Sequence, residues 1–334
     1  MSLGVAIVGC GLIGQKRAKA LGTGRLVACA DVNRDRANAL AAPAGAVAVQ
    51  DWQEAIRHPE VALVIIATLH DSLAEITRGA IAAGRHVLVE KPAARYASEI
   101  ADLPALAEAS GVRVRVGFNH RYHRAFRKAR QLVDQGALGP LMFLRARYGH
   151  GGRIGYEREW RADAKRSGGG ELIDQGPHLI DLARWFIGDF TRVEGFAHTY
   201  FWDMPVDDNG FMLLRTADDR VAFLHASCTE WKNIFSFEIY GRQGKLHIEG
   251  LGGSYGVERL SYYRMLPEMG PPETTIWEYP MADDSWQVEM AEFYEDIRLG
   301  RPPAAGLGDA IAVLDIVNCV RPAIRSGNAA PTPL

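Results

Sequence analysis

The sequence predicts two domains. Residues 1–121 are expected to form an α/β domain on a doubly wound parallel sheet, and residues 122–334 an α+β domain with a large, mostly antiparallel, open-faced sheet flanked by helices. In the first part, apolar strands alternate with helical segments, which is typical of right-handed β-α-β crossovers. In the second part, strands follow one another without helices between them, which favours antiparallel pairing. A chain of 334 residues is long enough for two such domains.

The first strand leads into a cluster of glycines. The run Val5–Gly14 (VAIVGCGLIG) is apolar, as expected of a strand buried on both faces, and places Gly9, Gly11 and Gly14 in the spacing G-x-G-x-x-G. In a dinucleotide-binding Rossmann loop, the first glycine permits a tight turn and the second lets the backbone approach a pyrophosphate. The third lets the following helix, expected at Gln15–Leu21, pack closely and direct its free N–H groups at the phosphates.

The second strand, Arg25–Ala30, ends at Asp31. An acidic residue about 20 residues after the glycines is typical of hydrogen bonding to the adenosine ribose. A carboxylate there also repels a 2′-phosphate, so we expect NAD rather than NADP, whereas Arg34 is of the residue type that accepts that phosphate. The alternative is an ordinary glycine turn in which Asp31 caps a helix. The strand before the glycines and the helix after them favour the nucleotide.

The remaining elements of the first domain continue the alternation. The expected helices are Arg34–Ala42, Trp52–Arg57, Leu73–Ala83 and Ser98–Ala109, and the expected strands are Val47–Val49, Val61–Ala67, His86–Val89 and Val112–Gly117. In parallel sheets, ligands bind outside the carboxyl ends of the strands. The polar residues of this domain gather at those ends, which are Gly9–Gly14, Asp31, Thr68–His70, Glu90–Pro92 and Phe118–Arg121.

The second domain lacks a dinucleotide signature, so we expect it to supply the substrate side and an interface. A long loop rich in Gly and Arg, Gly149–Gly170, interrupts it. The expected helices are Arg124–Gln135, Pro177–Ile187, Trp286–Leu299 and Leu307–Ser326. The expected strands are Leu141–Tyr148, Arg192–His198, Gly210–Thr216, Val221–Ser227, Ile234–Tyr240, Lys245–Glu249 and Thr275–Tyr279.

Composition excludes several classes of partner. The formal net charge of −2 gives no overall attraction to nucleic acid or to an anionic membrane. The four cysteines are scattered without a C-x-x-C pair, which argues against a structural zinc site or a disulfide framework and favours a reducing cytoplasm. The longest apolar run, Val61–Leu69, is too short to span a bilayer, and no basic segment marks a signal peptide. We therefore expect a cytoplasmic chain without membrane or nucleic-acid partners.

Lys91 is the first candidate for chemistry. It lies in Glu90-Lys91-Pro92 at the carboxyl end of a strand, and Pro92 biases it away from helix. There the ammonium could bind a substrate hydroxyl or stabilise an alkoxide. A surface lysine beside a glutamate is the alternative.

Asp174 and His178 form the second candidate, within the run GGGELIDQGPHLID (168–181). On a continuous helix they would share one face, whereas Pro177 makes it equally possible that they flank a helix start. Either arrangement lets the carboxylate orient the imidazole and raise its pKa, as suits a general base. The alternative is a buried histidine satisfied by Asp174 or Asp181. A metal site is not expected, because no fourth ligand accompanies these three side chains.

Together these motifs resemble the Gfo/Idh/MocA family of NAD(P)-dependent oxidoreductases over nearly the whole chain. The resemblance rests on VAIVGCGLIG, IATLHDSLAEITRGAIAAGRHVLVEKP, VGFNHRYH and EWRADAKRSGGGELIDQGPHLIDLARWFIGD. It implies a catalytic set of Lys91, Asp174 and His178. The cofactor-binding residues expected from the loop and the resemblance are Gly9, Gly11, Leu12, Ile13, Gly14, Asp31, Arg34, Thr68, His70, Glu90, Lys91 and Asn119. The chain departs from the family where Leu69-His70 replaces Pro-Asn and Leu73 replaces a histidine.

The expected activity is reversible oxidation of a secondary alcohol on a sugar, a sugar derivative or a polyol, with a nucleotide-linked sugar or a uronic acid among the candidates. His178 removes the hydroxyl proton, Asp174 holds its tautomer, and Lys91 stabilises the alkoxide. Arginines of the long loop, Arg153 and Arg161, could pair with a carboxylate or phosphate; a solvated basic loop is the alternative. The expected substrate contacts are Lys91, Arg121, Tyr156, Trp160, Arg161, Asp174 and His178, with His225, Glu230 and Trp231 as weaker candidates.

Two other functions are compatible with the resemblance. One is a glycosidase that oxidises a sugar transiently and returns the hydride to it. The other is a non-catalytic sensor that binds NAD to control a partner, although such proteins typically lose the catalytic set that this chain retains. The resemblance also implies a homodimer or homotetramer assembled through the C-terminal sheet.

Overall fold

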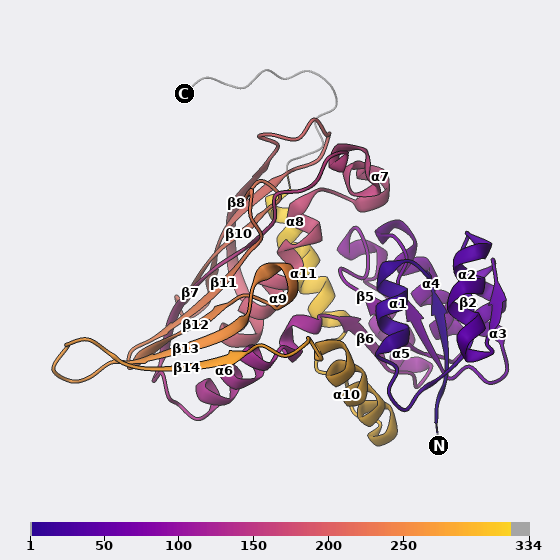
Figure 1. Cartoon of the computed structure of the whole chain (residues 1–334), viewed down its shortest axis with the longest axis horizontal. Coiled ribbons are helices and arrows are strands. Elements are labelled where there is room, and N and C mark those ends of the chain that lie inside the picture. The colour runs from indigo at the N-terminus through magenta and orange to yellow at the C-terminus, as the bar shows by residue number, and fades with distance from the viewer. Residues whose placement is uncertain (1, 322–334) are drawn as a thin grey trace.

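A computed structural model of the chain describes residues 2–321, which form two sheets with helices around them (Figure 1). The first sheet is entirely parallel, in the order β3-β2-β1-β4-β5-β6. Its strands are β1 (Gly4–Val8), β2 (Arg25–Ala30), β3 (Val47–Val49), β4 (Leu63–Ile66), β5 (His86–Glu90) and β6 (Val114–Gly117). The strand order reverses between β1 and β4, so a crevice opens at their carboxyl ends. The predicted doubly wound sheet is confirmed.

Both faces of this sheet are buried, as its unbroken apolar strands predict. Along β1, Val5 and Ile7 join one apolar cluster while Ala6 and Val8 join the other, because successive side chains point to opposite faces. The helices of this part are α1 (Leu12–Lys19), α2 (Arg34–Ala41), α3 (Trp52–Arg57), α4 (His70–Ala82) and α5 (Leu103–Ala109).

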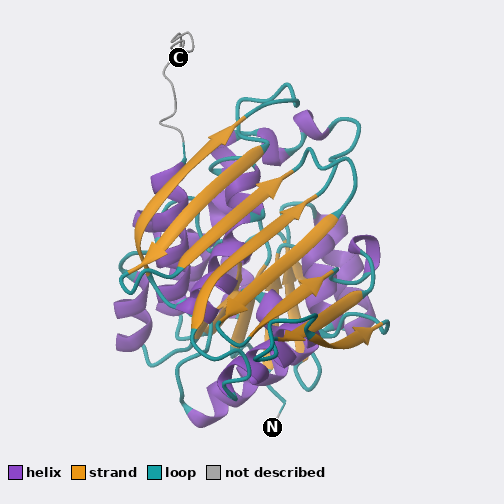
Figure 2. Cartoon of the chain, turned by 90° about the vertical axis from the view of Figure 1, so that its left-hand side faces the viewer, coloured by secondary structure: helices purple, strands orange, loops and turns teal. Residues whose placement is uncertain are grey.

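The second sheet has eight strands in the order β14-β13-β12-β11-β7-β10-β9-β8 and is antiparallel except for the pair β7 and β10. Its strands are β7 (Leu141–Gly149), β8 (Phe190–His198), β9 (Asn209–Thr216), β10 (Val221–Ser227), β11 (Ile234–Gly241), β12 (Gly244–Glu249), β13 (Glu258–Arg264) and β14 (Glu273–Tyr279). Helices α6 (Arg124–Asp134), α9 (Gly176–Ile187) and α11 (Leu307–Val320) pack on one face. The other face carries no helix (Figure 2).

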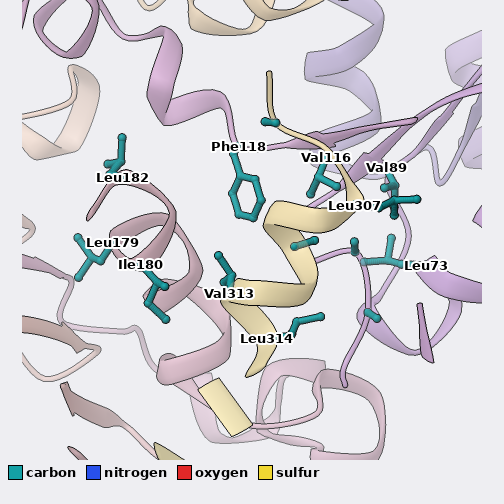
Figure 3. Packing of buried hydrophobic residues seen from close by; sticks show 14 of the residues in the cluster. Leu73, Val89, Val116, Phe118, Leu179, Ile180, Leu182, Leu307, Val313 and Leu314 are labelled. Carbon is teal, nitrogen blue, oxygen red and sulfur yellow. The ribbon is translucent and has the colours of Figure 1, made fainter. Parts of the chain in front are cut away.

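Two helices at the end of the described chain connect the sheets. Helix α10 (Ser285–Leu299) packs Met290 and Phe293 against the first sheet, although it follows the second sheet in sequence. Helix α11 lies between the two parts, so that a single apolar cluster extends from β5 and β6 to α9. Figure 3 shows this packing through Leu73, Val89, Val116, Phe118, Leu179, Ile180, Leu182, Leu307, Val313 and Leu314.

The structure differs from the predicted elements in several places. Strand β13 was not predicted, because it is rich in charged and tyrosine residues and one of its inward positions is Glu258. Helix α4 begins at His70 rather than Leu73, since Leu69 at its N-cap makes no side-chain cap that a sequence could signal. The expected helix Ser98–Ala109 is reduced to α5 after a separate turn, Ala97–Glu99. The predicted end of the last helix, beyond Val320, lies outside the described residues.

The long loop after β7 is made of short helical turns that lead into the glycines at positions 168–170. The turns are Tyr156–Arg158, Trp160–Ala162 and α7 (Ala164–Ser167). Helix α8 (Glu171–Asp174) then ends at Gln175, and α9 starts at Gly176 with Pro177 in its first turn. Asp174 and His178 therefore lie on two successive helices and not on one.

A buried ion pair should make a large contribution to stability. The Arg17 side chain is fully buried on α1 and donates a 2.6 Å hydrogen bond to Glu90 at the end of β5 and another to Glu289 on α10. We expect Arg17→Leu to lower the free energy of unfolding by about 3 kcal/mol, because it leaves two buried carboxylates unpaired. Thermal denaturation measures the effect.

The matched control is Arg25→Leu. Arg25 forms a 3.2 Å pair with Glu60, but both side chains are more than half exposed, at 55% and 54%. Removal of the Arg25 guanidinium should lower the free energy of unfolding by less than about 1 kcal/mol. Equal losses in the two variants would contradict the assignment of the buried pair.

Candidate active site

One cavity of about 600 Å³ lies between the carboxyl ends of the first sheet and the inner face of the second. Both domains contribute to its wall. The predicted residues that line it are Leu12, Ile13, Thr68, His70, Glu90, Lys91, Asn119, Trp160, Arg161, Asp174 and His178. Most of the predicted site therefore comes together in space.

The glycine loop has the geometry that a dinucleotide requires. Gly9 has a positive φ of 91°, and a Cβ there would lie 2.4 Å from the carbonyl oxygen of Ala67. A Cβ at Gly14 would lie 2.0 Å from the carbonyl oxygen of Gly9, so α1 could not pack as closely. At Gly11 a Cβ would meet no protein atom within 4 Å. The loop is thus tight on its protein side and open at Gly11, where a pyrophosphate would approach the uncapped end of α1.

Asp31 is held at the end of β2 by backbone groups. Its Oδ2 accepts a 2.8 Å hydrogen bond from the N–H of Cys10 in the glycine loop, and its Oδ1 accepts another from the N–H of Asn33. The carboxylate is only partly buried, so it keeps free acceptor capacity for a ribose hydroxyl. Arg34 is exposed at the start of α2. This arrangement fits NAD better than NADP.

Asp174 is bound by two cations. Lys91 Nζ donates to Asp174 Oδ1 at 2.9 Å and to its carbonyl oxygen at 2.6 Å, and Arg161 Nε donates to Asp174 Oδ2 at 2.7 Å. Burial alone would raise the pKa of the Asp174 carboxyl, but Lys91 and Arg161 hold that pKa well below its usual range. Asp174 is therefore a carboxylate at neutral pH.

His178 differs from the prediction. No hydrogen bond joins it to Asp174 in the described structure, because both carboxylate oxygens face Lys91 and Arg161; the Nδ1 atom of His178 is buried without a partner. Burial and the charge of Lys91 lower the pKa of His178 well below its usual value, against the opposing effect of Asp174. The expected hydrogen bond from His178 to Asp174 is therefore absent among residues 2–321, and the net pKa of His178 is lowered rather than raised, although the charge of Asp174 acts in the expected direction.

His120 is the main residue that sequence reasoning missed. Its ring stacks on the ring of His178 with 3.7 Å between centroids and 24° between planes. Its Nδ1 lies 3.2 Å from the side-chain oxygen of Asn119, and its Nε2 is buried without a partner. Burial, with His178 and His123 nearby, lowers the pKa of His120 well below its usual value. Two neutral imidazoles therefore stack in the wall of the cavity.

Two predicted substrate contacts lie outside the cavity. Arg121 is buried in an ion pair with Asp181 of α9, with hydrogen bonds of 2.8 Å and 2.5 Å. Tyr156 is 3% exposed, and its hydroxyl lies 3.3 Å from Glu171 Oε2. Arg121 connects the segment after β6 to α9, and Tyr156 connects the long loop to α8. Neither residue lines the cavity. Arg121 directly follows the lining residue His120, whereas Tyr156 lies four residues before the lining residue Trp160.

The long loop contributes its tryptophan and one arginine. Trp160 packs edge-on against His70 at 4.9 Å, and Arg161 lies over the Trp160 ring at 4.7 Å. The Nδ1–H group of His70 donates a 2.8 Å hydrogen bond to the Ser167 carbonyl oxygen, and burial together with Lys91 lowers the pKa of His70 to about 4. Arg153 pairs with Glu159 at 2.7 Å and does not line the cavity.

The other lining residues were not predicted as site residues. They are Lys16, Ala67, His120, His123, Tyr148, Gln175, Leu251, Gly252, Gly253, Ser254, Tyr255, Asp283 and Trp286. His120 and His123 lie beside Asn119 in the run VGFNHRYH, and Ala67 and Gln175 lie in two of the other motif runs. Lys16 and Ala67 belong to the first domain, whereas Tyr148 and residues 251–255 reach the cavity from β7 and from the loop between β12 and β13.

A parallel sheet with a glycine loop, joined to a second domain that completes the cavity, defines a two-domain dinucleotide-dependent oxidoreductase. The family profile "Oxidoreductase family, NAD-binding Rossmann fold" matches residues 3–118, and "GFO/IDH/MocA C-terminal domain" matches residues 126–247. The chain belongs to the Gfo/Idh/MocA family of oxidoreductases, as its motifs predict.

Named dehydrogenases among the relatives support the assignment to this family. Inositol 2-dehydrogenase 3 of Saccharopolyspora erythraea is 33% identical over an alignment that covers 100% of this chain and 96% of the relative. Levoglucosan dehydrogenase of Pseudarthrobacter phenanthrenivorans is 27% identical, over 59% of this chain and 57% of the relative. The match to that enzyme thus spans little more than half of its length.

Solved structures show the same fold. A levoglucosan dehydrogenase in complex with NADH and levoglucosan superimposes with a TM-score of 0.86, over 96% of both chains and at 22% sequence identity. Among residues 2–321, none of the helices combines the length and apolar character that crossing a bilayer requires. In that same range, no group of three or more His, Cys, Asp or Glu side chains is placed to hold a metal ion.

The stack of imidazoles leads to a prediction about protonation. His120→Ala should admit water to one face of His178 and raise its pKa toward the ordinary value of about 6.5, because desolvation is the largest cause of the shift. His120→Phe keeps an apolar ring there and should leave the pKa low. NMR titration of the histidine ring signals measures both, with His178→Gln to assign the signal.

The other charges near His178 are the same in both variants, since Lys91, Asp174 and His123 are retained. A difference in the His178 pKa between the Ala and Phe variants therefore measures the effect of the ring that stacks on His178. If the His178 pKa is identical in the wild type and in His120→Ala, the proposed effect of the stack is wrong.

Proposed function

We propose that the protein catalyses the reversible, NAD-dependent oxidation of a secondary hydroxyl group on a sugar or polyol to a ketone. One observation carries the proposal: the Lys91–Asp174 pair, 2.9 Å apart, lines the same cavity as His178 and the first residues of α1 after the glycine loop. The relatives act on levoglucosan and inositol according to their names, which supports a sugar or polyol substrate.

The cofactor would be held by the first domain. Its pyrophosphate would approach Gly11 and the start of α1, and its ribose hydroxyls would bind Asp31. Thr68, Glu90 and Asn119 line the cavity further along and would bracket the nicotinamide end. When bound, the nicotinamide accepts the hydride from the carbinol carbon.

Lys91 would stabilise the alkoxide. An ammonium group has three N–H donors, and two of them bind the carbonyl oxygen and carboxylate of Asp174. The third is left for the substrate hydroxyl. Because Asp174 fixes the group in place, the donor needs no reorganisation when negative charge develops on the oxygen.

His178 would accept the hydroxyl proton. Its Nδ1 is buried, which leaves Nε2 as the nitrogen that can reach a substrate in the cavity. The low pKa keeps the ring neutral and ready to accept a proton at physiological pH. Asp174 would favour the resulting imidazolium by its charge, without a direct hydrogen bond.

The loop arginines favour an uncharged substrate ring. Arg161 is bound to Asp174 at 2.7 Å, and Arg153 is bound to Glu159. Each arginine therefore already has a carboxylate partner. A phosphate or uronate would have to displace one of these pairs, so a neutral sugar or polyol is the better candidate.

The test combines binding and turnover. Purified protein freed of bound nucleotide is titrated with NAD and with NADP while thermal unfolding is followed, and a panel of sugars and polyols is then screened by absorbance of reduced cofactor. We expect stabilisation by NAD, weaker stabilisation by NADP, and reduction with at least one substrate. His178→Ala should lower kcat at least about 100-fold, as expected for loss of a general base.

The control is His58→Ala, a histidine after α3 that lies outside the cavity, which should retain the wild-type rate. Stabilisation by NAD without net reduction, together with sugar release from a glycoside, would indicate the hydride-recycling glycosidase instead. Stabilisation without any turnover would indicate the sensor. Absence of stabilisation by either nucleotide would contradict the cofactor assignment.

We infer further that the chain forms a homodimer or homotetramer through the uncovered face of the second sheet (Figure 2). Large apolar side chains project from this face on neighbouring strands: Phe143, Phe196, Leu213 and Phe223 are 36%, 77%, 46% and 45% exposed. Phe223 and Leu213 are direct cross-strand neighbours. Exposed apolar side chains gathered on one uncovered sheet face are typical of a protein–protein interface.

Phe223→Lys combined with Leu213→Lys should convert the assembly to monomers, because two charges would be buried without partners. Light scattering coupled to size exclusion measures the mass. Leu299→Lys is the matched control, since Leu299 is also exposed, at 52%, but ends α10 far from this face. A wild-type monomer, or an assembly unaffected by the double change, would contradict the interface.

A further inference from the structure

The side chain of His70 faces the second domain, although the sequence places this residue among the expected cofactor contacts. His70 begins α4 in the first domain and is only 4% exposed. Two of its contacts belong to the long loop of the second domain: the Trp160 ring packs edge-on with 4.9 Å between centroids, and the Ser167 carbonyl oxygen lies 2.8 Å from Nδ1. The ring therefore lies where the two domains meet, and it lines the cavity there.

The contact with Ser167 determines which nitrogen of the His70 ring carries the hydrogen. A carbonyl oxygen only accepts hydrogen bonds, so Nδ1 is the donor. The low pKa of His70 keeps the ring uncharged at physiological pH. In an uncharged imidazole with its hydrogen on Nδ1, the Nε2 atom has a free lone pair and can only accept.

The long loop holds the His70 ring in this orientation. Ser167 is 2% exposed; its N–H donates to the carbonyl oxygen of Asp163 at 2.9 Å, and its hydroxyl donates to the carbonyl oxygen of Gly169 at 2.6 Å. The carbonyl group that binds His70 is thus itself fixed, and the contact with Trp160 restrains the same ring. Nε2 is therefore a pre-oriented acceptor, which needs little ordering when a ligand binds.

Nε2 of His70 is open to the cavity. Within residues 2–321 it makes no hydrogen bond, yet it is not enclosed by protein, in contrast to Nδ1 of His178 and Nε2 of His120, which are buried without partners. Because His70 lines the cavity and is otherwise buried, its accessible nitrogen faces this space. The donor that satisfies Nε2 must then come from a ligand or from water.

A short series of contacts joins His70 to the ion pair proposed to act on the reacting hydroxyl. Trp160, which packs on His70, lies under the guanidinium of Arg161 at 4.7 Å, and Arg161 donates to Asp174 at 2.7 Å. Asp174 is bound in turn by Lys91 at 2.9 Å. The charges of Lys91, Asp174 and Arg161 all act on the pKa of His70, as expected of groups that lie near the ring.

We propose that Nε2 of His70 accepts a hydrogen bond from a second hydroxyl group of the substrate, in addition to the hydroxyl that is oxidised at Lys91 and His178. His70 is then a specificity-determining residue, because a substrate without that second hydroxyl leaves a buried acceptor unpaired. A phosphate group has no hydrogen to donate at neutral pH and does not suit this position. The inference rests on the function proposed above and specifies its substrate class as polyhydroxy compounds, in preference to their deoxy derivatives.

The experiment removes the hydroxyl from the substrate and the acceptor from the enzyme. D-Glucose, myo-inositol and the monodeoxy derivatives of each are given to the NAD-loaded enzyme while reduced cofactor is followed by absorbance, and their binding to the NADH-loaded enzyme is measured by calorimetry. For the better of the two parent compounds, we expect one deoxy derivative to lose at least about tenfold in kcat/KM and in affinity with the wild type.

Two variants separate the two nitrogens of the His70 ring. His70→Asn keeps an N–H donor for the Ser167 carbonyl but has no acceptor at the place of Nε2, so it should use the parent compound and that derivative equally. His70→Gln brings an amide oxygen to the place of Nε2 and should keep part of the preference. The affinity for NAD, measured by calorimetry, should stay at the wild-type value in both variants.

His86→Asn is the matched control, because His86 is a half-buried histidine that begins β5, at the opposite end of that strand from Lys91. It should keep the wild-type preference. The substrate contact is overturned if the wild type binds neither parent compound or binds every derivative as well as its parent, if His70→Asn keeps the preference, or if the Asn and Gln variants lose it equally. A weaker affinity for NAD with an unchanged preference would assign the ring to the cofactor. Failure of the dehydrogenase itself is distinguishable, since binding to the NADH-loaded enzyme reports the preference without turnover.

Discussion

The ion pair between Lys91 and Asp174 joins the two halves of the molecule and sets the charges of the whole site. Lys91 follows β5 of the first sheet, and Asp174 ends α8 of the second domain. A buried carboxylate is costly unless it is paired, and here Lys91 and Arg161 both compensate it. The same Lys91 charge helps to keep His178 neutral. The contact between Lys91 and Asp174 therefore connects the two domains at the cavity and helps to keep the base, His178, neutral.

This contact depends on packing elsewhere. Glu90, the residue before Lys91, is held by the buried guanidinium of Arg17, which also binds Glu289 of α10. On the other side, α11 packs its apolar residues between Phe118 and α9, the helix that carries His178 (Figure 3). Helices from the end of the described chain thus fix the distance between the two parts of the site, so a domain boundary drawn only from the sequence misses what holds the domains together.

Sequence motifs predicted those features of the site that depend on residues close together in the chain. The glycine loop, Asp31 and the strand ends at Thr68 and Glu90 follow from spacing along one parallel sheet, and that sheet is doubly wound as expected. Long-range contacts were beyond such reasoning. Asp174 was expected to bind His178, yet Lys91 and Arg161 occupy its oxygens, because the break between α8 and α9 turns the carboxylate toward the first domain. The stacking of His120 on His178 likewise depends on how two distant segments meet.

His178 has to stay neutral before the substrate arrives and has to accept a proton during turnover. The arrangement around the ring serves both needs without a direct hydrogen bond between His178 and Asp174. A hydrogen bond from the ring to the Asp174 carboxylate would raise the pKa of His178 and so favour its protonation before substrate arrives. With Asp174 bound to Lys91 and with His120 excluding water, the ring stays neutral in the resting enzyme. The nearby carboxylate still offsets positive charge once the proton is transferred. The cost of a buried, unpaired Nδ1 is thus consistent with a base that is charged only during turnover.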